Sequence, residues 1–268
     1  MKKTLALCVM ILAAVSLFAA GSKESGEDSS LKKIQDRGTF ILGLDDTFPP
    51  MGFRNENNEI VGFDIDLARE VTKRMGVTLL LQPIDWNAKE QELNTGKIDC
   101  IWNGFTVTEE RKKVVNFSEP YLENAQVAVV KTSSAVTTLA DLAGKSIGLQ
   151  AGSSASNAVD AAPVFKASLK GIVEFKENLT ALMDLEIGGV DAVIVDLLVA
   201  NDNIKRSGKD FRILDESLAP ENYAIGFRKN DNALRNAVQK HLDDMAADGT
   251  MARISTTWFG ADITIVGK

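Results

Sequence analysis

Reactive and cross-linking residues are scarce in this sequence of 268 residues. It contains two cysteines, Cys8 and Cys100, and one histidine, His241. Because Cys8 lies in a segment that we expect to be removed on export, we expect no disulfide within the remaining chain. Structural and catalytic metal sites need clusters of ligating side chains such as His and Cys, so the sequence predicts no metal ion, and no motif indicates a cofactor.

Basic residues are fewer than acidic residues. The chain has 30 Lys and Arg against 37 Asp and Glu, which gives a formal net charge of −7. Nucleic acids and anionic lipid surfaces select basic footprints. The charge balance therefore excludes both from the expected partners.

Long apolar runs are lacking except at the N-terminus. Lys2 and Lys3 precede an apolar run over residues 5–20, and small residues follow it. This order is typical of a secretory signal peptide, so we expect residues 1–21 to be removed and the protein to work in the periplasm. A retained membrane anchor is an alternative, although the run is short for a membrane span.

Two further expectations concern the same region. Only seven residues precede Cys8, too few for a full signal before a lipidated cysteine, so a lipid anchor is an alternative that we do not favour. Residues 22–30 are rich in Ser, Glu, Asp and Gly and carry no apolar side chain, which predicts a disordered linker.

The rest of the chain alternates short apolar runs with helical patterns. Strand-like runs are expected at 39–44, 77–82, 98–102, 146–149, 173–175 and 192–195, and helices follow them, the last over 233–248. Such alternation predicts parallel sheets covered by helices on both faces. The pattern runs twice, and two extended crossings near 122–130 and 220–227 connect the two runs.

We therefore predict an α/β fold of two lobes, each a mainly parallel sheet flanked by helices, joined by a two-strand hinge. The expected first lobe comprises residues 31–123 and 224–268, and the second comprises residues 124–223. Two lobes joined in this way enclose a cleft that can close around a ligand.

Arg111 places a cation where a helix favours anions. Thr108 is the expected N-cap, and Arg111 follows within the first turn of the helix. The unfavourable interaction of this cation with the helix dipole would be offset if an anion bound there, on the guanidinium and on free backbone N–H groups. A solvated surface arginine is the alternative.

Further polar and aromatic side chains follow the predicted strands or open the predicted helices, the positions at which open α/β sheets bind ligands. They are Asp45, Phe48, Trp86, Asn103, Gly104 and Thr106 in the first lobe and Gln150, Ser153, Ser154 and Asp196 in the second. With Arg111, they offer a cation and hydroxyls for a carboxylate, carboxylates for an ammonium group, and aromatic walls. This set describes a site for a free amino acid. Ordinary roles as helix caps, turn residues or core are the alternatives.

Four sequence blocks resemble one protein family. They are Gly62-Phe63-Asp64-Ile65-Asp66-Leu67-Ala68, Thr106-Val107-Thr108-Glu109-Glu110-Arg111-Lys112, Val115-Asn116-Phe117-Ser118-Glu119-Pro120-Tyr121 and Ala246-Ala247-Asp248-Gly249-Thr250. In this order they resemble the periplasmic amino-acid-binding proteins of ABC importers, the polar amino acid group of type 2 periplasmic binding proteins. The resemblance covers nearly all of residues 31–262.

The resemblance implies a role for each candidate residue. Arg111 would hold the ligand α-carboxylate with Thr106, Ser153 and Ser154, and Asp196 and the Gly104 carbonyl would hold the α-ammonium. Asp45 would orient the ammonium or the side chain, Phe48 and Trp86 would enclose the side chain, and Asn103 and Gln150 would contact its polar end. Asn103 and Trp86 depart from the residues common in relatives, which leaves the preferred side chain open. Lys89, one helical turn from Trp86, is expected at the surface, with contact to an acidic ligand side chain as the alternative.

The expected function is capture of an L-amino acid, preferably one with a neutral polar side chain, and its delivery to an inner-membrane ABC permease by a monomeric binding protein. One alternative is an amino-acid-sensing protein that serves a separate receptor. A cleft enzyme such as a dehydratase is a further alternative. Chemistry would need an acid–base group or a nucleophile in the cleft, and His241 is expected on the solvated face of the terminal helix.

Overall fold

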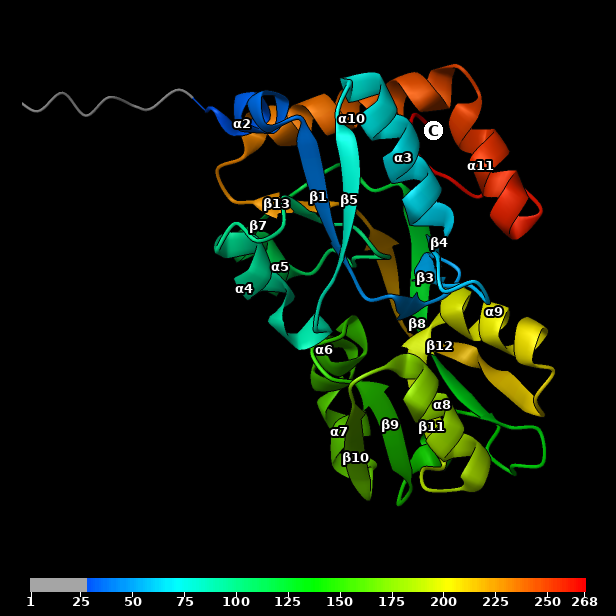
Figure 1. Ribbon diagram of the computed structural model, residues 1–268. Helices are drawn as coiled ribbons and strands as arrows, with labels where there is room; N and C mark the ends of the chain where they lie inside the picture. The colour runs from blue at the N-terminus through cyan, green and yellow to red at the C-terminus, as the bar shows by residue number, and fades with distance from the viewer. Residues whose placement is uncertain (1–27) are drawn as a thin grey trace, which may run out of the picture.

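The computed structural model describes residues 28–268, which form two lobes (Figure 1). The predicted signal peptide, residues 1–21, and residues 22–27 of the predicted linker lie outside the described residues. Across the described part of the chain, every helix is either too short or too polar to cross a membrane.

The last three residues of the predicted linker belong to the folded body. Asp28 accepts hydrogen bonds from the backbone N–H groups of Ser30 at 2.9 Å and Ala233 at 2.6 Å, and the Ser30 hydroxyl accepts one from Leu234 at 3.1 Å. These bonds satisfy free N–H groups at the starts of two helices. The linker prediction is therefore wrong for residues 28–30.

The sheet of the first lobe has the strand order β5-β1-β6-β13-β7. β13 runs antiparallel to both neighbours, and the other four strands point the same way. A small antiparallel sheet of β2, β3 and β4 follows β1. The strands are β1 (Thr39–Leu44), β2 (Thr47–Phe48), β3 (Gly52–Arg54), β4 (Ile60–Val61), β5 (Thr78–Pro83), β6 (Cys100–Ile101), β7 (Val115–Phe117) and β13 (Gly226–Arg228).

Helices cover both faces of this sheet. α2, α3 and α10 share one apolar core with Phe40 and Leu42 of β1, whereas Leu93 of α4 packs with Ile41 on the opposite face. This follows from the alternation of side chains along a strand. The helices are α2 (Ser30–Arg37), α3 (Phe63–Met75), α4 (Lys89–Asn94, preceded by a 3-10 turn at Trp86–Ala88), α5 (Glu109–Val114), α10 (Asn232–Ala247) and α11 (Thr250–Phe259).

The second lobe repeats this arrangement with the strand order β10-β9-β11-β8-β12, in which β8 is the reversed strand. α8 and α9 pack on one face, and α6 and α7 lie on the other. The elements are β8 (Leu122–Lys131), a 3-10 turn (Ala140–Leu142), β9 (Ser146–Gln150), α6 (Ser154–Asp160), α7 (Pro163–Ser168), β10 (Gly171–Phe175), α8 (Asn178–Ile187), β11 (Ala192–Asp196), α9 (Leu197–Ser207) and β12 (Phe211–Tyr223).

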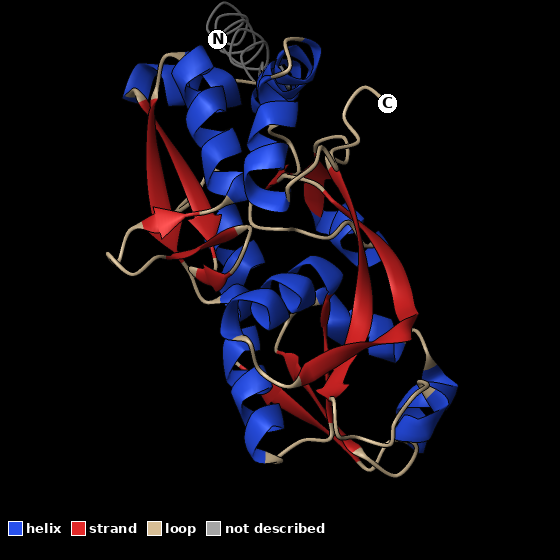
Figure 2. Cartoon of the chain, turned by 90° about the vertical axis from the view of Figure 1, so that its right-hand side faces the viewer, coloured by secondary structure: helices blue, strands red, loops and turns tan. Residues whose placement is uncertain are grey.

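Two long strands connect the lobes, as the side view shows (Figure 2). β8 and β12 pair from Leu122 and Tyr223 at the first lobe to Lys131 and Phe211 inside the second. The predicted hinge crossings lie on these strands. The predicted residue limits of the lobes, 31–123 with 224–268 and 124–223, remain a prediction.

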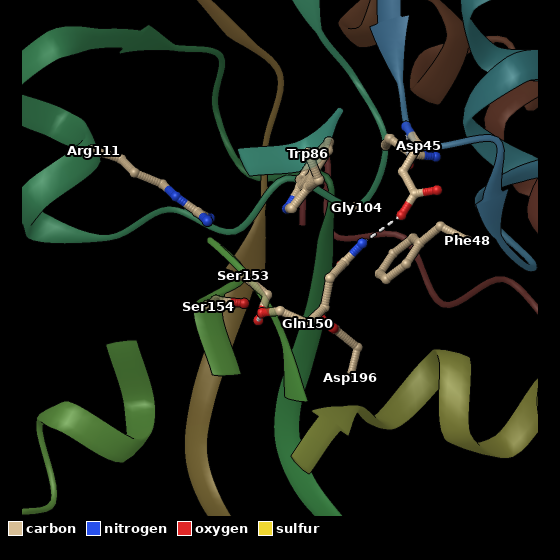
Figure 3. A pocket seen from close by; sticks show the side chains of 10 residues that line it. Asp45, Phe48, Trp86, Gly104, Arg111, Gln150, Ser153, Ser154 and Asp196 are labelled. Atoms are coloured by element: carbon tan, nitrogen blue, oxygen red, sulfur yellow. Dashed lines mark hydrogen bonds between the residues drawn. The ribbon is translucent and has the colours of Figure 1, made fainter. Parts of the chain in front are cut away.

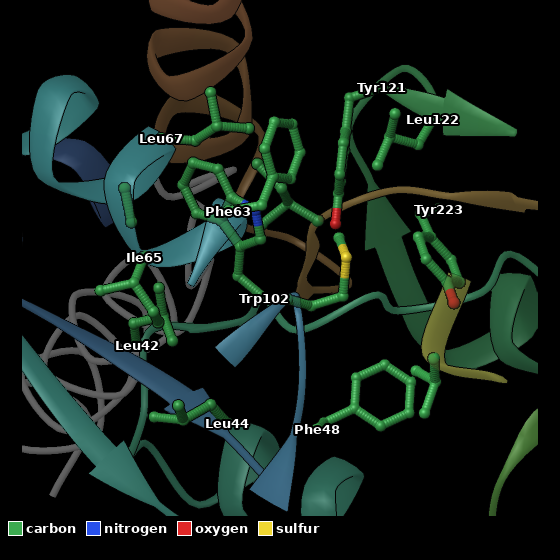
Figure 4. Packing of buried hydrophobic residues seen from close by; sticks show 14 of the residues in the cluster. Leu42, Leu44, Phe48, Phe63, Ile65, Leu67, Trp102, Tyr121, Leu122 and Tyr223 are labelled. Carbon is green, nitrogen blue, oxygen red and sulfur yellow. The ribbon is translucent and has the colours of Figure 1, made fainter. Parts of the chain in front are cut away.

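The apolar core of the first lobe extends to the hinge (Figure 4). Phe63 lies 6.3 Å from Tyr121 between ring centroids, and both rings are fully buried, as are Trp102 and Tyr223. Large buried rings that are close-packed in this way restrict the positions of their neighbours. The core therefore holds the ends of β6 and β12, which face the space between the lobes.

Candidate functional site

One small cavity between the lobes brings together ten of the eleven residues selected from the sequence (Figure 3). Its lining residues are Asp45, Phe48, Trp86, Asn103, Gly104, Arg111, Gln150, Ser153, Ser154 and Asp196. The eleventh residue, Thr106, is buried beside the cavity and bonds to Arg111 and Ser154.

Arg111 is buried and held by backbone oxygens. Thr108 caps α5 as expected, because its hydroxyl accepts the Arg111 backbone N–H at 3.1 Å. One guanidinium nitrogen donates to the Thr106 carbonyl at 2.9 Å, another donates to the Gly152 carbonyl at 3.2 Å, and the group lies 4.6 Å from the Phe105 ring centroid. Burial lowers the pKa of Arg111 against the effect of nearby carboxylates. The alternative of a solvated surface arginine is wrong.

Ser153 and Ser154 begin α6 at the cavity. Ser153 occupies the N-cap position, but its hydroxyl donates to the Gln150 carbonyl at 2.7 Å and does not cap the helix. Ser154 donates to the Thr106 hydroxyl at 3.1 Å. The first turn of α6 therefore presents N–H groups beside Arg111, an arrangement suited to a carboxylate.

Asp196 ends β11 and is buried. It precedes α9, yet its side chain makes no capping hydrogen bond in the described structure. Instead, one carboxylate oxygen accepts from Asn124 Nδ2 at 2.8 Å and from the Tyr223 hydroxyl at 2.6 Å. Burial, and then the charge of Glu221, raise the pKa of Asp196 to about 7. A cation from a ligand would relieve this cost.

Gly104 occupies a position that requires glycine. Its φ is +57°, and a Cβ there would lie 2.8 Å from the Phe48 ring and 3.1 Å from the Tyr223 ring. The backbone N–H of Gly104 donates to Asp64 at 2.7 Å, and Tyr121 donates to the same oxygen at 3.0 Å. Asp64, which the sequence placed in a helix without a role at the site, thus fixes the loop that lines the cavity.

Asp45 and Gln150 meet at another part of the cavity. Gln150 Nε2 donates to one Asp45 carboxylate oxygen at 2.6 Å, while the other oxygen accepts from Thr47 in a local turn. Asn178 donates to the Gln150 side-chain oxygen at 3.0 Å. Asn103 accepts from the Asp45 backbone N–H at 3.1 Å, and its own Nδ2 has no partner within residues 28–268.

Phe48 and Trp86 supply the aromatic surface of the cavity. Both are buried, and each belongs to an apolar cluster as well as to the lining. Trp86 also packs edge-on against Phe105 at 5.9 Å between ring centroids. Both rings therefore belong to the apolar core, as the alternative had it, and both also line the cavity; their contact with a ligand remains a prediction.

Two sequence-based placements are wrong. Lys89 is not at the surface: its side chain is 3 % exposed, and its ammonium donates to the carbonyls of Trp86 at 3.1 Å and Gly152 at 2.8 Å. Burial, and then the charge of Arg111, lower the pKa of Lys89 to about 8. His241 on α10 is partly buried, with its side chain 20 % exposed. It does not line the cavity.

The two lobes touch across the cavity. Residues of the first lobe bond directly to Gly152, Gln150 and Ser154 of the second, and Gly152 packs against Asn87 so closely that a Cβ would lie 3.2 Å from the Asn87 Cα. The structure therefore has closed lobes. The described residues contain no cluster of His, Cys, Asp and Glu that could hold a metal ion.

Sequence reasoning missed several polar residues around the cavity. Glu221, Asn124 and Gln126 lie on the hinge strands, and Asn178 starts α8. Their contacts depend on how distant strands pair, so neither periodicity nor composition distinguishes them. The available signal was that the two crossings, otherwise largely apolar, carry Asn124, Gln126 and Glu221.

Known proteins are similar to this chain over nearly its whole length. The L-cystine-binding protein TcyJ of Escherichia coli is 31 % identical over 261 residues, which cover 96 % of each chain. A solved structure of Tv2483 bound to L-arginine is 35 % identical, with a TM-score of 0.87, and covers 90 % of this chain and 99 % of its own. A substrate-binding protein of an ABC uptake transporter from Streptococcus pneumoniae, with bound histidine, is 38 % identical with a TM-score of 0.86 and the same coverage.

The family comparison covers most of the chain. Residues 40–261 match the family model of bacterial extracellular solute-binding proteins, family 3. Its members bind solutes, and the two-lobe α/β fold of the solved relatives is the fold described above. This protein therefore belongs to the bacterial extracellular solute-binding proteins, family 3.

Proposed function

We propose that this protein captures a free L-amino acid in the cavity between its lobes and delivers it to an ABC permease. The observation that carries the proposal is the pairing of opposite charges across one cavity: Arg111 comes from the first lobe and Asp196 from the second. Both are buried, and neither charge has an ion-pair partner closer than 3.9 Å within residues 28–268. A zwitterion would compensate both charges at once.

The ligand would lie with its α-carboxylate on Arg111 and the first turn of α6. Its α-ammonium would meet Asp196 and the Gly104 carbonyl. Its side chain would pass between Phe48 and Trp86. Arg111 keeps guanidinium N–H groups beyond the two used on carbonyls, so a carboxylate can still bind there.

The chemistry around Asp45 supports a polar side chain. Asp45 is buried, and its described partners are a backbone N–H, a hydroxyl and an amide, all of them neutral donors. A ligand whose far end donates hydrogen bonds would suit this carboxylate, whether that end is a neutral amide or a cation. Lys89, although buried nearby, directs its ammonium to two carbonyls and does not line the cavity.

The site would act outside the cytoplasm. The predicted signal peptide and membership of the extracellular solute-binding family support this location, and the Streptococcus pneumoniae relative, a substrate-binding protein of an ABC uptake transporter, supports an ABC permease as the partner. We propose a monomer, because the whole cavity is built from one chain. Since the ligand touches both lobes only when they are closed, binding would shift the equilibrium toward the closed form.

Binding without catalysis is part of the proposal. The family is one of solute-binding proteins, and the cavity lining contains no histidine, cysteine or lysine. A turnover assay with the bound amino acid tests this directly. Recovery of the amino acid unchanged after prolonged incubation is expected, and loss of ammonia or water from it would contradict the proposal.

Replacing Arg111 by alanine tests the carboxylate contact. We expect Arg111→Ala to weaken binding of the tightest-binding L-amino acid by about 2–5 kcal/mol, because the carboxylate would be buried without its charged partner. Isothermal titration calorimetry on the mature chain measures the loss. Lys112→Ala, which removes an exposed cation from the same helix, is the matched control and should bind as the wild type does.

Replacing Asp196 by asparagine tests the ammonium contact in the same titrations. Asp196→Asn should weaken binding of the amino acid far more than binding of the same acid without its α-amino group. Asp191→Asn, which removes an exposed carboxylate just before β11, serves as the control. Equal losses for the amino acid and its deaminated analogue would rule out the proposed role of Asp196.

A further inference from the structure

Four polar side chains share one face of the hinge. Glu221 lies directly opposite Asn124 in the pairing of β12 with β8. Tyr223 and Gln126 lie two residues further along their strands, and alternate residues of a strand point to the same side. Glu221, Tyr223, Asn124 and Gln126 therefore project together toward the space between the lobes.

Glu221 is where these side chains converge. One of its carboxylate oxygens accepts three hydrogen bonds, from Thr106 Oγ1 at 3.0 Å, Asn124 Nδ2 at 3.2 Å and Gln126 Nε2 at 3.0 Å. Thr106 belongs to the first lobe, and the two amides belong to the hinge strand that enters the second. Glu221 thus connects groups from both lobes, although it does not line the cavity.

Each donor to Glu221 also contacts a residue of the proposed ligand site. Asn124 Nδ2 donates to Asp196 at 2.8 Å, and Gln126 Nε2 donates to the Ser154 hydroxyl at 3.2 Å. The Ser154 hydroxyl donates to Thr106 at 3.1 Å. Thr106 has a single hydroxyl proton, and Glu221 accepts it, so the Thr106 oxygen is left to accept from Ser154. The bonds form a closed ring that exists only when the lobes are together.

The same contacts place two carboxylates close to each other. Asn124 Nδ2 bridges Glu221 and Asp196, and the charged or titratable groups that face Asp196 are Glu221 and Tyr223 of β12 and Arg111 of α5. The negative charge of Glu221 is one cause of the raised pKa of Asp196. Two adjacent carboxylates with one shared neutral donor favour a cation beside them.

We propose that Glu221 is a positioning residue for ligand capture. It holds Asp196 toward the ligand ammonium through Asn124, and through Thr106 and the Ser154 hydroxyl it holds the first turn of α6 at the ligand carboxylate, so that the two halves of the site assemble together on closure. This inference rests on the proposed function, and it adds a residue outside the cavity whose charge and length both affect affinity.

Glu221→Gln tests the charge with little change in shape. The twenty standard L-amino acids and L-cystine are first titrated into the wild-type mature chain by calorimetry, and the tightest binder is then used from pH 5.5 to 8.5. At pH 8 and above, where Asp196 is ionised in both proteins, Glu221→Gln should bind about 10- to 100-fold more weakly. Glu123→Gln, on the neighbouring strand and exposed, should match the wild type.

The pH profile separates positioning from general stability. Wild-type affinity should fall about tenfold per pH unit below a midpoint near 7, because protonated Asp196 cannot pair with an ammonium group. Without the charge of Glu221 the pKa of Asp196 falls, so the midpoint for Glu221→Gln should move about one pH unit lower. A loss of general stability would lower the affinity without moving the midpoint.

Glu221→Asp separates the charge from the reach of the side chain. It keeps the carboxylate but shortens it, so it should retain a midpoint close to the wild-type value and still lose affinity at pH 8. If Glu221→Gln binds with the same affinity and the same pH midpoint as the wild type, the inference is overturned while the proposed function stands. Failure of the wild type to bind any compound of the panel would overturn the proposed function, and the inference with it.

Discussion

Asp64 is a buried carboxyl group whose hydrogen-bond partners are neutral. It accepts from the Gly104 backbone N–H and from the Tyr121 hydroxyl, and its second oxygen has no partner among residues 28–268. Burial raises the pKa of Asp64 to about 7. Such a group destabilises the fold at neutral pH, and its position against Gly104 indicates that the cost is tolerated to fix the cavity loop.

The sign of this cost gives a prediction. The pKa of Asp64 is higher in the folded state than its ordinary value of 3.8, so the folded state binds more protons, and stability is lost as pH rises from about 4 to about 7. We expect the free energy of unfolding of Asp64→Asn, relative to that of the wild type, to increase by about 1 kcal/mol per pH unit between pH 5 and 7. Above pH 7 this difference should stay constant. Urea unfolding at several pH values measures the difference, and parallel curves would contradict it.

Two short helices carry the residues proposed to hold the ligand carboxylate. α5 spans Glu109–Val114 and α6 spans Ser154–Asp160, and neither could form alone in water at such a length. α5 depends on its cap, because the Thr108 hydroxyl accepts the backbone N–H of Arg111 itself. The cap therefore fixes the start of the helix and the backbone from which the Arg111 side chain extends.

Removing this cap should reduce both stability and affinity. We expect Thr108→Ala to lower the free energy of unfolding by about 1 kcal/mol and to weaken amino acid binding in addition, because Arg111 loses its anchor. Thr256→Ala is the control, since its hydroxyl bonds within the exposed part of α11 and touches no site residue. Urea unfolding and calorimetry measure the two effects. A loss of stability with unchanged affinity would show that Arg111 is held by its carbonyl contacts alone.

The sequence predicts those elements whose signals are local. The strand at 39–44, the cap at Thr108 and the strand ending at Asp196 were all expected from apolar runs and helix-start residues, and the structure has them. The helix Thr250–Phe259 was not expected. It contains Thr and Ile, has no side-chain cap, and is held by distant contacts such as the bond from Trp258 to Asp66 at 2.9 Å.

The candidate site follows the same division. Residues that directly follow strands were predicted to lie at the site, because the topology of the sheet places the strand ends together. Lys89 was expected at the surface, and Glu221 was not predicted to lie near the site. Charged residues of this kind usually lie at the surface. Lys89 is buried only because the second lobe approaches it, and Glu221 meets Asn124 only because their strands pair. Tertiary contacts of this kind leave no periodic trace in the sequence.

Closure of the whole molecule depends on a close approach at Gly152. Its φ is +68°, a Cβ would lie 2.8 Å from Asn87 Oδ1, and its carbonyl accepts from both Lys89 and Arg111. One backbone segment of the second lobe thus receives two cations of the first. These contacts involve no ligand, so they stabilise the closed form by themselves.

Substitution at Gly152 should impair closure selectively. We expect Gly152→Ala to weaken binding by about tenfold or more, because the added Cβ meets Asn87 only when the lobes are closed. Gly144→Ala is a matched control, since φ there is +73° and a Cβ would contact nothing within 4 Å. Calorimetry gives the affinities, and small-angle X-ray scattering with and without the amino acid gives the compaction. If Gly152→Ala and Gly144→Ala weaken binding equally, the loss of affinity is due to backbone strain and not to impaired closure.

The neighbouring positions of Asn124 and Glu221 have a consequence for how such molecules can be recombined. The chain leaves the first lobe at Asn124 and returns to it at Glu221, and these two residues are paired in the β8–β12 ladder. The segment between them is therefore an insertion whose two ends lie side by side. An insertion of this kind can be exchanged for its counterpart from another member of the family without lengthening or stretching the host chain. Such a graft would transplant Gln150, Ser153, Ser154 and Asp196 as a set while leaving Arg111, Asp45, Phe48 and Trp86 in place, so the two halves of the site can be exchanged separately.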